Sequence, residues 1–290
     1  MSHTLLTETI AFVGAGALAE SIFAGLIEKG ITAPQQLFAV NQSNDERLAY
    51  VRDTYGMRAS RDPEERDSAI REAGIVILNM KPKDAAAGIS DIRHLLGPNQ
   101  LIVSVIAGLS IGTIHHLLGA PLPVVRTMPN TSSTIGLGAT GISFSEAVTA
   151  ERRATALSLF RAIGEVSVVE EERLEIVTGV SGSGPAYIYY FMEAMIAAGV
   201  EGGLSEEAAR SLTVQTVLGA AQMVKTTNEA PQELRRKVTS PNGTTEAAIK
   251  LMESEGVADA ISRAVLRSAE RAREIGLGLA EQSLAHGKRV

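Results

Sequence analysis

Residues 239–245, TSPNGTT, combine hydroxyl, amide, proline and glycine residues directly before an expected helix. Four of the seven residues carry a hydroxyl group, and the first acidic residue after them is Glu246. Such a stretch can simply begin a helix, because Asn, Ser and Thr cap helices and Pro and Gly form the preceding turn. It can also bind a ligand, because backbone N–H groups at a helix start attract anions. The stretch alone leaves both interpretations open.

A second candidate is the glycine-rich stretch FVGAGALAES, residues 12–21. It places Gly14, Gly16 and Ala19 in the pattern Gly-x-Gly-x-x-Ala between an expected strand and an expected helix. In dinucleotide-binding proteins the first glycine allows a tight turn, the second lets the backbone approach a pyrophosphate, and the small third residue lets the helix pack closely. The pattern favours a dinucleotide cofactor, although a tight strand–helix turn also needs glycine. The expected contacts are Gly14, Ala15, Gly16, Ala17, Leu18 and Ala19.

The loop after the second expected strand bears on the type of cofactor. An NAD-specific site usually places Asp or Glu here, where it bonds the ribose 2′-hydroxyl. This chain reads Asn41, Gln42, Ser43 and Asn44, with Arg47 one turn into the following helix. Without an acid the loop would not repel a 2′-phosphate, so we expect NADPH to be preferred and NADH to be possible. Asn41, Ser43 and Arg47 are the expected contacts, and the alternative is a plain loop with a helix cap.

Further candidates follow other expected strands at their carboxyl ends, where ligands bind in parallel sheets. NMKPKD (79–84), IAGLS (106–110) and TMPNTSS (127–133) all lie at such ends. Small residues and Asn130 suit a nicotinamide ring, and Asn79 and Met80 are expected to contact the cofactor. Lys81 could instead be solvated, and Pro82 could be an ordinary first-turn proline.

The pattern of elements indicates how these loops are positioned. Short apolar runs alternate with helical patterns in the first half of the chain, which indicates a parallel sheet with crossover helices. Helices are expected to begin at Asp62-Pro63 and at Ser110, and a further one covers 150–164. The expected strands are 9–14, 37–40, 74–80, 101–107, 123–128, 140–144 and 165–170.

Long helices replace strands after residue 170. We therefore expect an α/β fold with an N-terminal Rossmann-like dinucleotide-binding domain, residues 1–168, and an all-helical C-terminal dimerisation domain, residues 169–290. Two stretches, 186–200 and 212–224, are apolar or small nearly all the way round, which is typical of helices buried on every side. A second subunit is the expected cover, with a compact monomer as the alternative. The expected helices are 185–200, 206–226, 244–255 and 257–280, followed by a frayed tail.

Composition argues against several classes of function. The net charge of −6 disfavours nucleic acid or an anionic membrane as a partner. The chain has no Cys and five scattered His, so we expect no disulfide and no metal site. Residues 1–8 lack the features of a signal peptide, and no stretch is typical of a membrane span. We expect a cytoplasmic protein with a small-molecule substrate.

Three longer motifs carry a resemblance to a known family: VRTMPNT (125–131), VSGSGPAYIYYFMEA (180–194) and VTSPNGTTEAA (238–248). With these motifs the chain resembles the pyrroline-5-carboxylate reductase family, from the glycine-rich stretch to about residue 276. The resemblance implies reduction of 1-pyrroline-5-carboxylate to L-proline with NAD(P)H, often NADPH, as the last step of proline biosynthesis. It also implies a helical domain that interlocks with a second subunit, and an active site at the interface of a homodimer or higher homo-oligomer.

By position, the resemblance implies cofactor contacts at Gly14 to Ala19, Ser43, Lys81, Pro82, Ala107 and Gly108. It implies substrate contacts at Ser240, Asn242, Gly243, Thr244 and Thr245, with the Thr245 hydroxyl bonding the ring nitrogen as the catalytic group. The backbone N–H groups of 242–245 would then hold the substrate carboxylate. Because a protonated imine is already electrophilic, the reaction needs positioning more than a strong acid. Ser183 is expected to lie near the substrate, or else to belong to a close-packed helix start.

Two residues depart from the family pattern. Asn242 stands where relatives commonly have Gly, which restricts the backbone, and Gln42 stands where they often have Arg, which weakens the argument for NADPH. Asn242 keeps open the alternative of a nucleotide-binding regulatory homologue without catalysis. A dehydrogenase of the hydroxyacid type is a further alternative. Such enzymes use a Lys on the first helix of the second domain, however, and residues 185–200 contain none.

Overall fold

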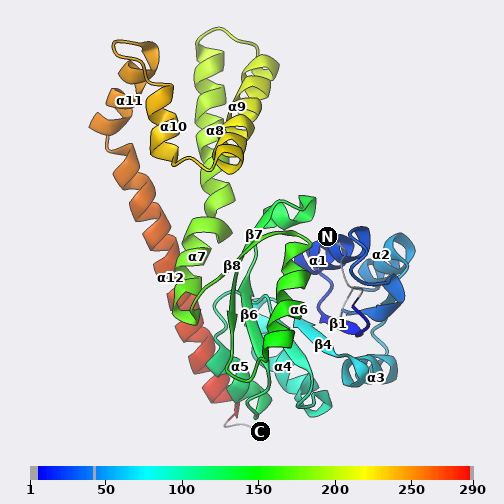
Figure 1. Ribbon diagram of the computed structural model, residues 1–290. Helices are drawn as coiled ribbons and strands as arrows, with labels where there is room; N and C mark the ends of the chain where they lie inside the picture. The colour runs from blue at the N-terminus through cyan, green and yellow to red at the C-terminus, as the bar shows by residue number, and fades with distance from the viewer. Residues whose placement is uncertain (1–5, 42–43, 288–290) are drawn as a thin grey trace. The chain divides into compact units, whose positions relative to one another are not determined.

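A computed structural model of the chain describes residues 6–41 and 44–287 (Figure 1). The chain divides into two compact units. The first comprises residues up to Gly182 together with those from Arg267 onward, and the second comprises Ser183–Leu266. Within the described stretches, no helix combines the length and the apolar character that a bilayer span requires.

The first unit is built around one sheet with the strand order β3-β2-β1-β4-β5-β6-β7-β8. The order of its first six strands is that of the Rossmann fold, which confirms the predicted fold class. Neighbouring strands run parallel except β6 and β7, which are antiparallel. The strands are β1 (Ile10–Val13), β2 (Leu37–Val40), β3 (Arg58–Ala59), β4 (Ile75–Leu78), β5 (Leu101–Ser104), β6 (Val124–Met128), β7 (Gly138–Phe144) and β8 (Gly164–Val168).

Two features of the sheet differ from the sequence prediction. β3 was not predicted, because two residues are too short to give a periodic pattern. The antiparallel β6–β7 pair departs from the predicted parallel sheet, because only the short 3-10 helix η4 (Thr131–Ile135) and the turn after it join these strands. A parallel neighbour would need a crossover connection of a dozen or more residues.

Helices cover both faces of this sheet (Figure 1). Along β1, Ile10 and Phe12 belong to one hydrophobic core and Ala11 belongs to the other. The first core also contains residues of α1, α2 and α6, and the second contains residues of α3, α4, α5 and α12. The helices that lie wholly in this unit are α1 (Ala17–Glu28), α2 (Asp45–Tyr55), α3 (Pro63–Glu72), α4 (Ala85–Ile92), α5 (Ile111–Leu118), α6 (Ala150–Arg161) and α7 (Leu174–Val177).

The predicted helix starts are confirmed by their caps. The Asp62 carboxylate accepts the N–H groups of Glu64 and Glu65, and the Ser110 hydroxyl accepts the N–H of Thr113. Both residues therefore satisfy N–H groups that have no acceptor within the helix.

The second unit is entirely helical and exposes much of its apolar surface. In the fully described helix α8 no residue is buried, and in α9 the buried residues are Ala209 and Thr213. Its helices are α8 (Gly184–Glu201), α9 (Glu206–Thr227), α10 (Pro231–Lys237), α11 (Thr244–Ser254) and the first part of α12 (Val257–Gly287). Large apolar side chains with substantial exposure are Ile188, Tyr189, Tyr190, Phe191, Val200, Leu204, Leu212, Val214, Leu218, Met223, Val238, Leu251, Ile261 and Leu266.

The compact units do not divide at residue 168. α7 and the π-helical turn Thr178–Gly182 belong to the first unit, where Val177 packs against Gly141 of β7. α12 continues to Gly287, past the predicted end near residue 280, and its last part also belongs to the first unit. A domain boundary at residue 168 therefore remains a prediction. The short helix α10 was not predicted.

Candidate active site

Gly14 lies where β1, β2 and β4 end. Its N–H donates to the carbonyl of Val40 at 3.0 Å, and its φ of +109° is a conformation that other residues rarely adopt. A Cβ atom at this position would lie 2.3 Å from the carbonyl oxygen of Asn79. The fold itself therefore requires glycine here.

Gly16 has a different environment. It is the exposed N-cap of α1, and a Cβ atom there would lie 3.6 Å from Nδ2 of Asn79, an ordinary contact distance. The protein thus has room for a side chain at Gly16. The N–H groups of the first turn of α1 have no acceptor within the helix. Open space beside such N–H groups fits a pyrophosphate, whose approach a side chain would block.

A cavity of about 500 Å³ opens beside the glycine loop, which we define as residues 14–19. It lies at the carboxyl ends of β1, β2 and β4, next to the point where the strand order reverses, which is where such sheets bind dinucleotides. The predicted cofactor residues that line it are Gly14, Ala15, Gly16, Asn41, Asn79, Met80 and Lys81. The volume and the lining fit a dinucleotide.

The remaining predicted cofactor residues lie elsewhere in the first unit. Ala17, Leu18 and Ala19 form the first turn of α1, Arg47 is in α2, Pro82 begins the 3-10 helix η2 (Pro82–Asp84), Ala107 and Gly108 follow β5, and Asn130 follows β6. Ser43 lies outside the described residues, as does Gln42.

Basic residues that were not predicted also line the cavity. Lys83 is exposed like Lys81, and neither forms an ion pair with another described residue. Arg66 pairs with Asp67 and Asp91, both at 2.8 Å, and so joins α3 to α4 along the wall. The two lysines therefore remain available to an anionic ligand.

Arg47 is not among the residues that line the cavity. Its Nε donates to the carbonyl of Ala15 at 2.6 Å, and its guanidinium pairs with Glu20 at 2.5 Å. Glu20 also accepts the hydroxyl groups of Tyr55 (2.6 Å) and Tyr50 (3.1 Å). Burial acts to raise the pKa of Glu20, but the hydrogen bonds from Tyr55, Arg47 and Tyr50 outweigh it and hold this pKa below its usual value. A contact between Arg47 and a 2′-phosphate remains a prediction.

Gly108 lies in the loop after β5 and is close to α12. Its φ is +77°, and a Cβ atom on it would lie 3.2 Å from the backbone nitrogen of Gly276. A Cβ atom on Gly276 would in turn lie 2.7 Å from the carbonyl oxygen of Gly108. Two glycines far apart in the sequence therefore let this loop and α12 approach closely.

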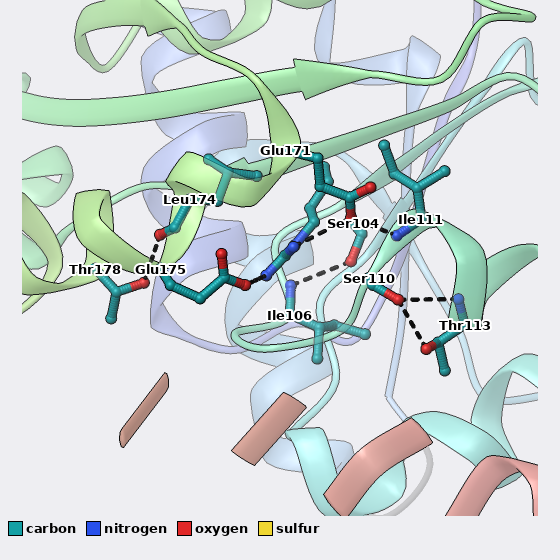
Figure 2. Close-up of polar contacts among 10 residues, drawn as sticks. Ser104, Ile106, Ser110, Ile111, Thr113, Glu171, Leu174, Glu175 and Thr178 are labelled. Atoms are coloured by element: carbon teal, nitrogen blue, oxygen red, sulfur yellow. Dashed lines mark hydrogen bonds and ion pairs between the residues drawn. The ribbon is translucent and has the colours of Figure 1, made fainter. Parts of the chain in front are cut away.

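A network of charged groups fixes the helix that follows this loop (Figure 2). Glu171 accepts the N–H of Ile111, the first residue of α5, at 2.7 Å. Glu171 also pairs with Arg126 of β6 at 3.1 Å, and Arg126 pairs with Glu175 at 3.0 Å. Sequence analysis did not identify this network. The available signal was a single cation in the apolar strand VVRTM, since a buried cation needs a charged partner.

Asn130 uses both ends of its amide within the first unit. Its Nδ2 donates to the carbonyl of Ser181 at 3.0 Å, and its Oδ1 accepts the N–H of Ala139 at 3.2 Å. The side chain thus ties β7 to the π-helical turn. A cofactor contact by Asn130 remains a prediction.

The hydroxyl-rich stretch lies in the second unit, immediately before α11. Asn242 has a φ of +60°, a conformation that Asn tolerates better than most residues, so the departure from Gly is accommodated. Its N–H donates to Glu246 at 3.0 Å, and the N–H of Gly243 donates to the carbonyl of Ser240 at 3.0 Å. Two of the four N–H groups predicted to hold a carboxylate are therefore already bonded within the chain.

The other two N–H groups belong to Thr244 and Thr245, the first residues of α11. At these positions an N–H group has no acceptor within the helix, so it can bind an anion. The Thr245 side chain is half-buried, whereas Ser240 and Thr244 are exposed. Ser183 directly precedes α8.

Comparisons with known proteins match both units. A family profile described as pyrroline-5-carboxylate reductase dimerisation matches residues 171–275, and one described as NADP oxidoreductase, coenzyme F420-dependent, matches residues 9–108. Pyrroline-5-carboxylate reductase 2 of Bacillus subtilis (strain 168) is 42% identical over 92% of this chain and 94% of its own length. The pyrroline-5-carboxylate reductase of Pseudomonas aeruginosa is 41% identical over 93% of this chain and 99% of its own.

Solved structures agree with these matches. A pyrroline-5-carboxylate reductase from Coxiella burnetii has a TM-score of 0.87 and 36% identity, covering 93% of this chain and 99% of that one. A Plasmodium falciparum pyrroline carboxylate reductase, solved with NADP bound, has a TM-score of 0.83 and 26% identity, covering 94% of this chain and 100% of that one.

Proposed function

The chain belongs to the pyrroline-5-carboxylate reductase family, and we propose from this membership that it reduces 1-pyrroline-5-carboxylate to L-proline, the last step of proline biosynthesis. The observation that carries the proposal is 42% identity over 92% of the chain to a reductase of this name. The cavity beside the glycine loop and the hydroxyl-rich stretch supply a cofactor site and a substrate site of suitable chemistry.

The first unit would hold the cofactor. The N–H groups at the start of α1 would bind its pyrophosphate, and the space beside Gly16 would admit the phosphate oxygens. The chemistry that the cofactor supplies when bound is hydride donation to the imine carbon.

The second unit would hold the substrate. The N–H groups of Thr244 and Thr245 would bind the substrate carboxylate at the positive end of α11. The Thr245 hydroxyl would accept the N–H of the protonated imine and so fix the orientation of the C=N bond. Because the protonated imine is already electrophilic, orientation is the main requirement, and the stretch needs no acid or base.

We propose NADPH as the preferred cofactor. The residues described between β2 and α2, Asn41 and Asn44, carry no negative charge that would repel a 2′-phosphate, and Lys81 and Lys83 line the cavity. Lys81→Ala should therefore raise the KM for NADPH more than the KM for NADH. An equal rise for both cofactors would exclude Lys81 as a 2′-phosphate contact.

A cytoplasmic homodimer or higher homo-oligomer completes the proposal. The exposed apolar side chains of the second unit and its match to a dimerisation profile support self-association. The absence of Cys means that the fold requires no oxidising compartment.

Turnover of the purified full-length protein tests the proposed reaction. NADPH absorbance should fall only when 1-pyrroline-5-carboxylate is added, with proline formed in equal amount. Binding of NADPH without turnover would favour the regulatory homologue, and turnover of a 2-hydroxy or 2-oxo acid instead would favour a hydroxyacid-type dehydrogenase.

A further inference from the structure

Glu20 lies in the first turn of α1, at the helix end where the cofactor site requires positive potential. A carboxylate there stabilises the helix dipole of the free protein. The same charge would repel a bound pyrophosphate if it were left uncompensated. The residues around Glu20 must therefore neutralise it before the site can accept an anion.

Arg47 supplies this neutralisation. Its guanidinium pairs with Glu20 at 2.5 Å, while its Nε bonds the carbonyl oxygen of Ala15 at 2.6 Å. The Arg47 and Glu20 side chains are only 21% and 24% exposed, so solvent screens the pair incompletely. The guanidinium also lies 5.1 Å from the ring centre of Tyr50, and the hydroxyls of Tyr50 and Tyr55 bond Glu20.

The bond to Ala15 acts on the glycine loop directly. Ala15 lines the cavity, and an unpaired carbonyl oxygen there would also repel an anion. The charged donor of Arg47 offsets the partial negative charge of this carbonyl oxygen and fixes the orientation of the carbonyl group. The N–H groups at the start of α1 then face the ligand without an opposing carbonyl.

We propose that Arg47 is a positioning residue for the glycine loop, which pairs with Glu20 and Ala15 so that the start of α1 can accept the pyrophosphate of either cofactor. This inference rests on the proposed function, because it requires a bound dinucleotide. It differs from recognition of a 2′-phosphate, since the guanidinium contacts Ala15, Glu20 and Tyr50 of the protein itself and Arg47 does not line the cavity.

Dinucleotide binding by variants of the full-length protein tests the inference. Arg47→Ala should raise the Kd for NADPH and for NADH by a similar factor, about tenfold. Glu20→Gln should leave both values near those of the parent. The double variant Glu20→Gln/Arg47→Ala should recover part of the loss, because it removes the uncompensated carboxylate.

Arg52→Ala is the matched control. Arg52 is also in α2, but it bonds the carbonyl of Ala59 at 2.8 Å, so its loss should leave both Kd values unchanged. Amide hydrogen exchange in residues 14–20 of the cofactor-free protein should rise in Arg47→Ala and not in Arg52→Ala. This second measurement needs no cofactor, and thermal unfolding of each variant shows that it is folded.

The parent protein separates failure of the proposed function from failure of this inference. If the parent binds neither dinucleotide, the proposed function is wrong. If the parent binds both and Arg47→Ala weakens NADPH alone, Arg47 contacts the 2′-phosphate and the inference is overturned. The inference would also be overturned if Arg47→Ala weakened the binding of NADPH and NADH equally and the added Glu20→Gln substitution restored none of the affinity.

Discussion

Gly14 and Gly16 differ in what surrounds them, although only one residue separates them. At Gly14 a side chain would meet the carbonyl of Asn79 at 2.3 Å, and at Gly16 it would meet the Asn79 side chain at 3.6 Å. Packing within the protein itself requires glycine at position 14, whereas glycine at position 16 leaves space for a ligand.

Gly14→Ala and Gly16→Ala should therefore fail in different ways. Gly14→Ala combines a positive φ with a steric clash, so the free energy of unfolding should fall by about 3 kcal/mol or more. Gly16→Ala should change it by no more than about 1 kcal/mol but weaken NADPH binding by at least roughly tenfold. Denaturant unfolding and cofactor titration measure the two effects. A stable Gly16→Ala variant with the parent's affinity would disprove the pyrophosphate site.

Thr245 is the side chain on which the proposed reaction depends most. Loss of its hydroxyl in Thr245→Ala removes a hydrogen bond to a charged group, worth roughly 1.5–3 kcal/mol. The kcat/KM should then fall by about ten- to a hundredfold, and Thr245→Ser should lose much less. NADPH affinity should stay close to the parent value.

Thr244→Ala is the control for this position. Thr244 is the neighbouring residue, it also contributes a backbone N–H, and its side chain is exposed. The kcat/KM of the Thr244→Ala variant should stay within about threefold of the parent value, because the backbone N–H of residue 244 is kept in the variant. A larger loss at Thr244 than at Thr245 would mean that the other hydroxyl bonds the ring nitrogen.

For single residues, the sequence predicts where the site residues lie better than it predicts which groups their side chains contact. The spacing of Gly14 and Gly16 indicates a phosphate site because the local turn imposes it. The partners of Arg47, Asn130 and Asn242 depend on segments that only the folded chain brings together. A hydrogen-bonding side chain in a loop therefore identifies a region of the site but not which group it serves.

Elements are predicted well where burial leaves a simple local pattern in the sequence. Strands such as LFAV and IVIL are buried on both faces and give continuous apolar runs, so the central sheet is visible in the sequence. The antiparallel return of β7 and the approach of Gly108 to Gly276 are not visible. Both arise from packing between elements that share no local pattern.

The network of Arg126, Glu171 and Glu175 should be the main polar link between β6, α5 and α7. Arg126→Met should lower the free energy of unfolding by about 2 kcal/mol, because it removes a buried cation from two partly exposed carboxylates. Glu171 should then bond the N–H of Ile111 less firmly, so exchange of this amide should rise. Denaturant unfolding and hydrogen exchange measure the two effects.

Arg153→Met is a suitable comparison for this substitution. Arg153 lies over the ring of Phe144 at 5.1 Å, and no ion pair joins it to another described residue. Arg153→Met should lower the free energy of unfolding by less than about 1 kcal/mol. Equal losses at both positions would show that the charge network contributes little.

For the whole molecule, the exposed apolar surface of the second unit predicts association. Tyr190 is 76% exposed and Leu218 is 55% exposed, and many large apolar neighbours are exposed with them. Many large apolar side chains exposed on one unit are typical of a surface that another subunit covers. Light scattering at low micromolar concentration should therefore show a homodimer or a larger assembly and no folded monomer.

A charge placed on this surface should disrupt the assembly. Tyr190→Glu should lower the measured mass or cause aggregation, because the interface would have to bury an unpaired carboxylate. Gln232→Glu adds the same charge at an exposed polar position of α10 and should leave the mass unchanged. A compact, active monomer of the parent would refute the prediction.

The discontinuous first unit has a consequence for synthesis of the chain. Leu279 of α12 belongs to the same hydrophobic core as Ala11 of β1, and residues 183–266 separate the two parts of the unit. Domains generally fold from the N-terminus as they leave the ribosome. Here the sheet emerges early, but its core is completed only when α12 has been translated. The nascent chain therefore carries an open apolar surface on its nucleotide-binding unit until α12 has been translated.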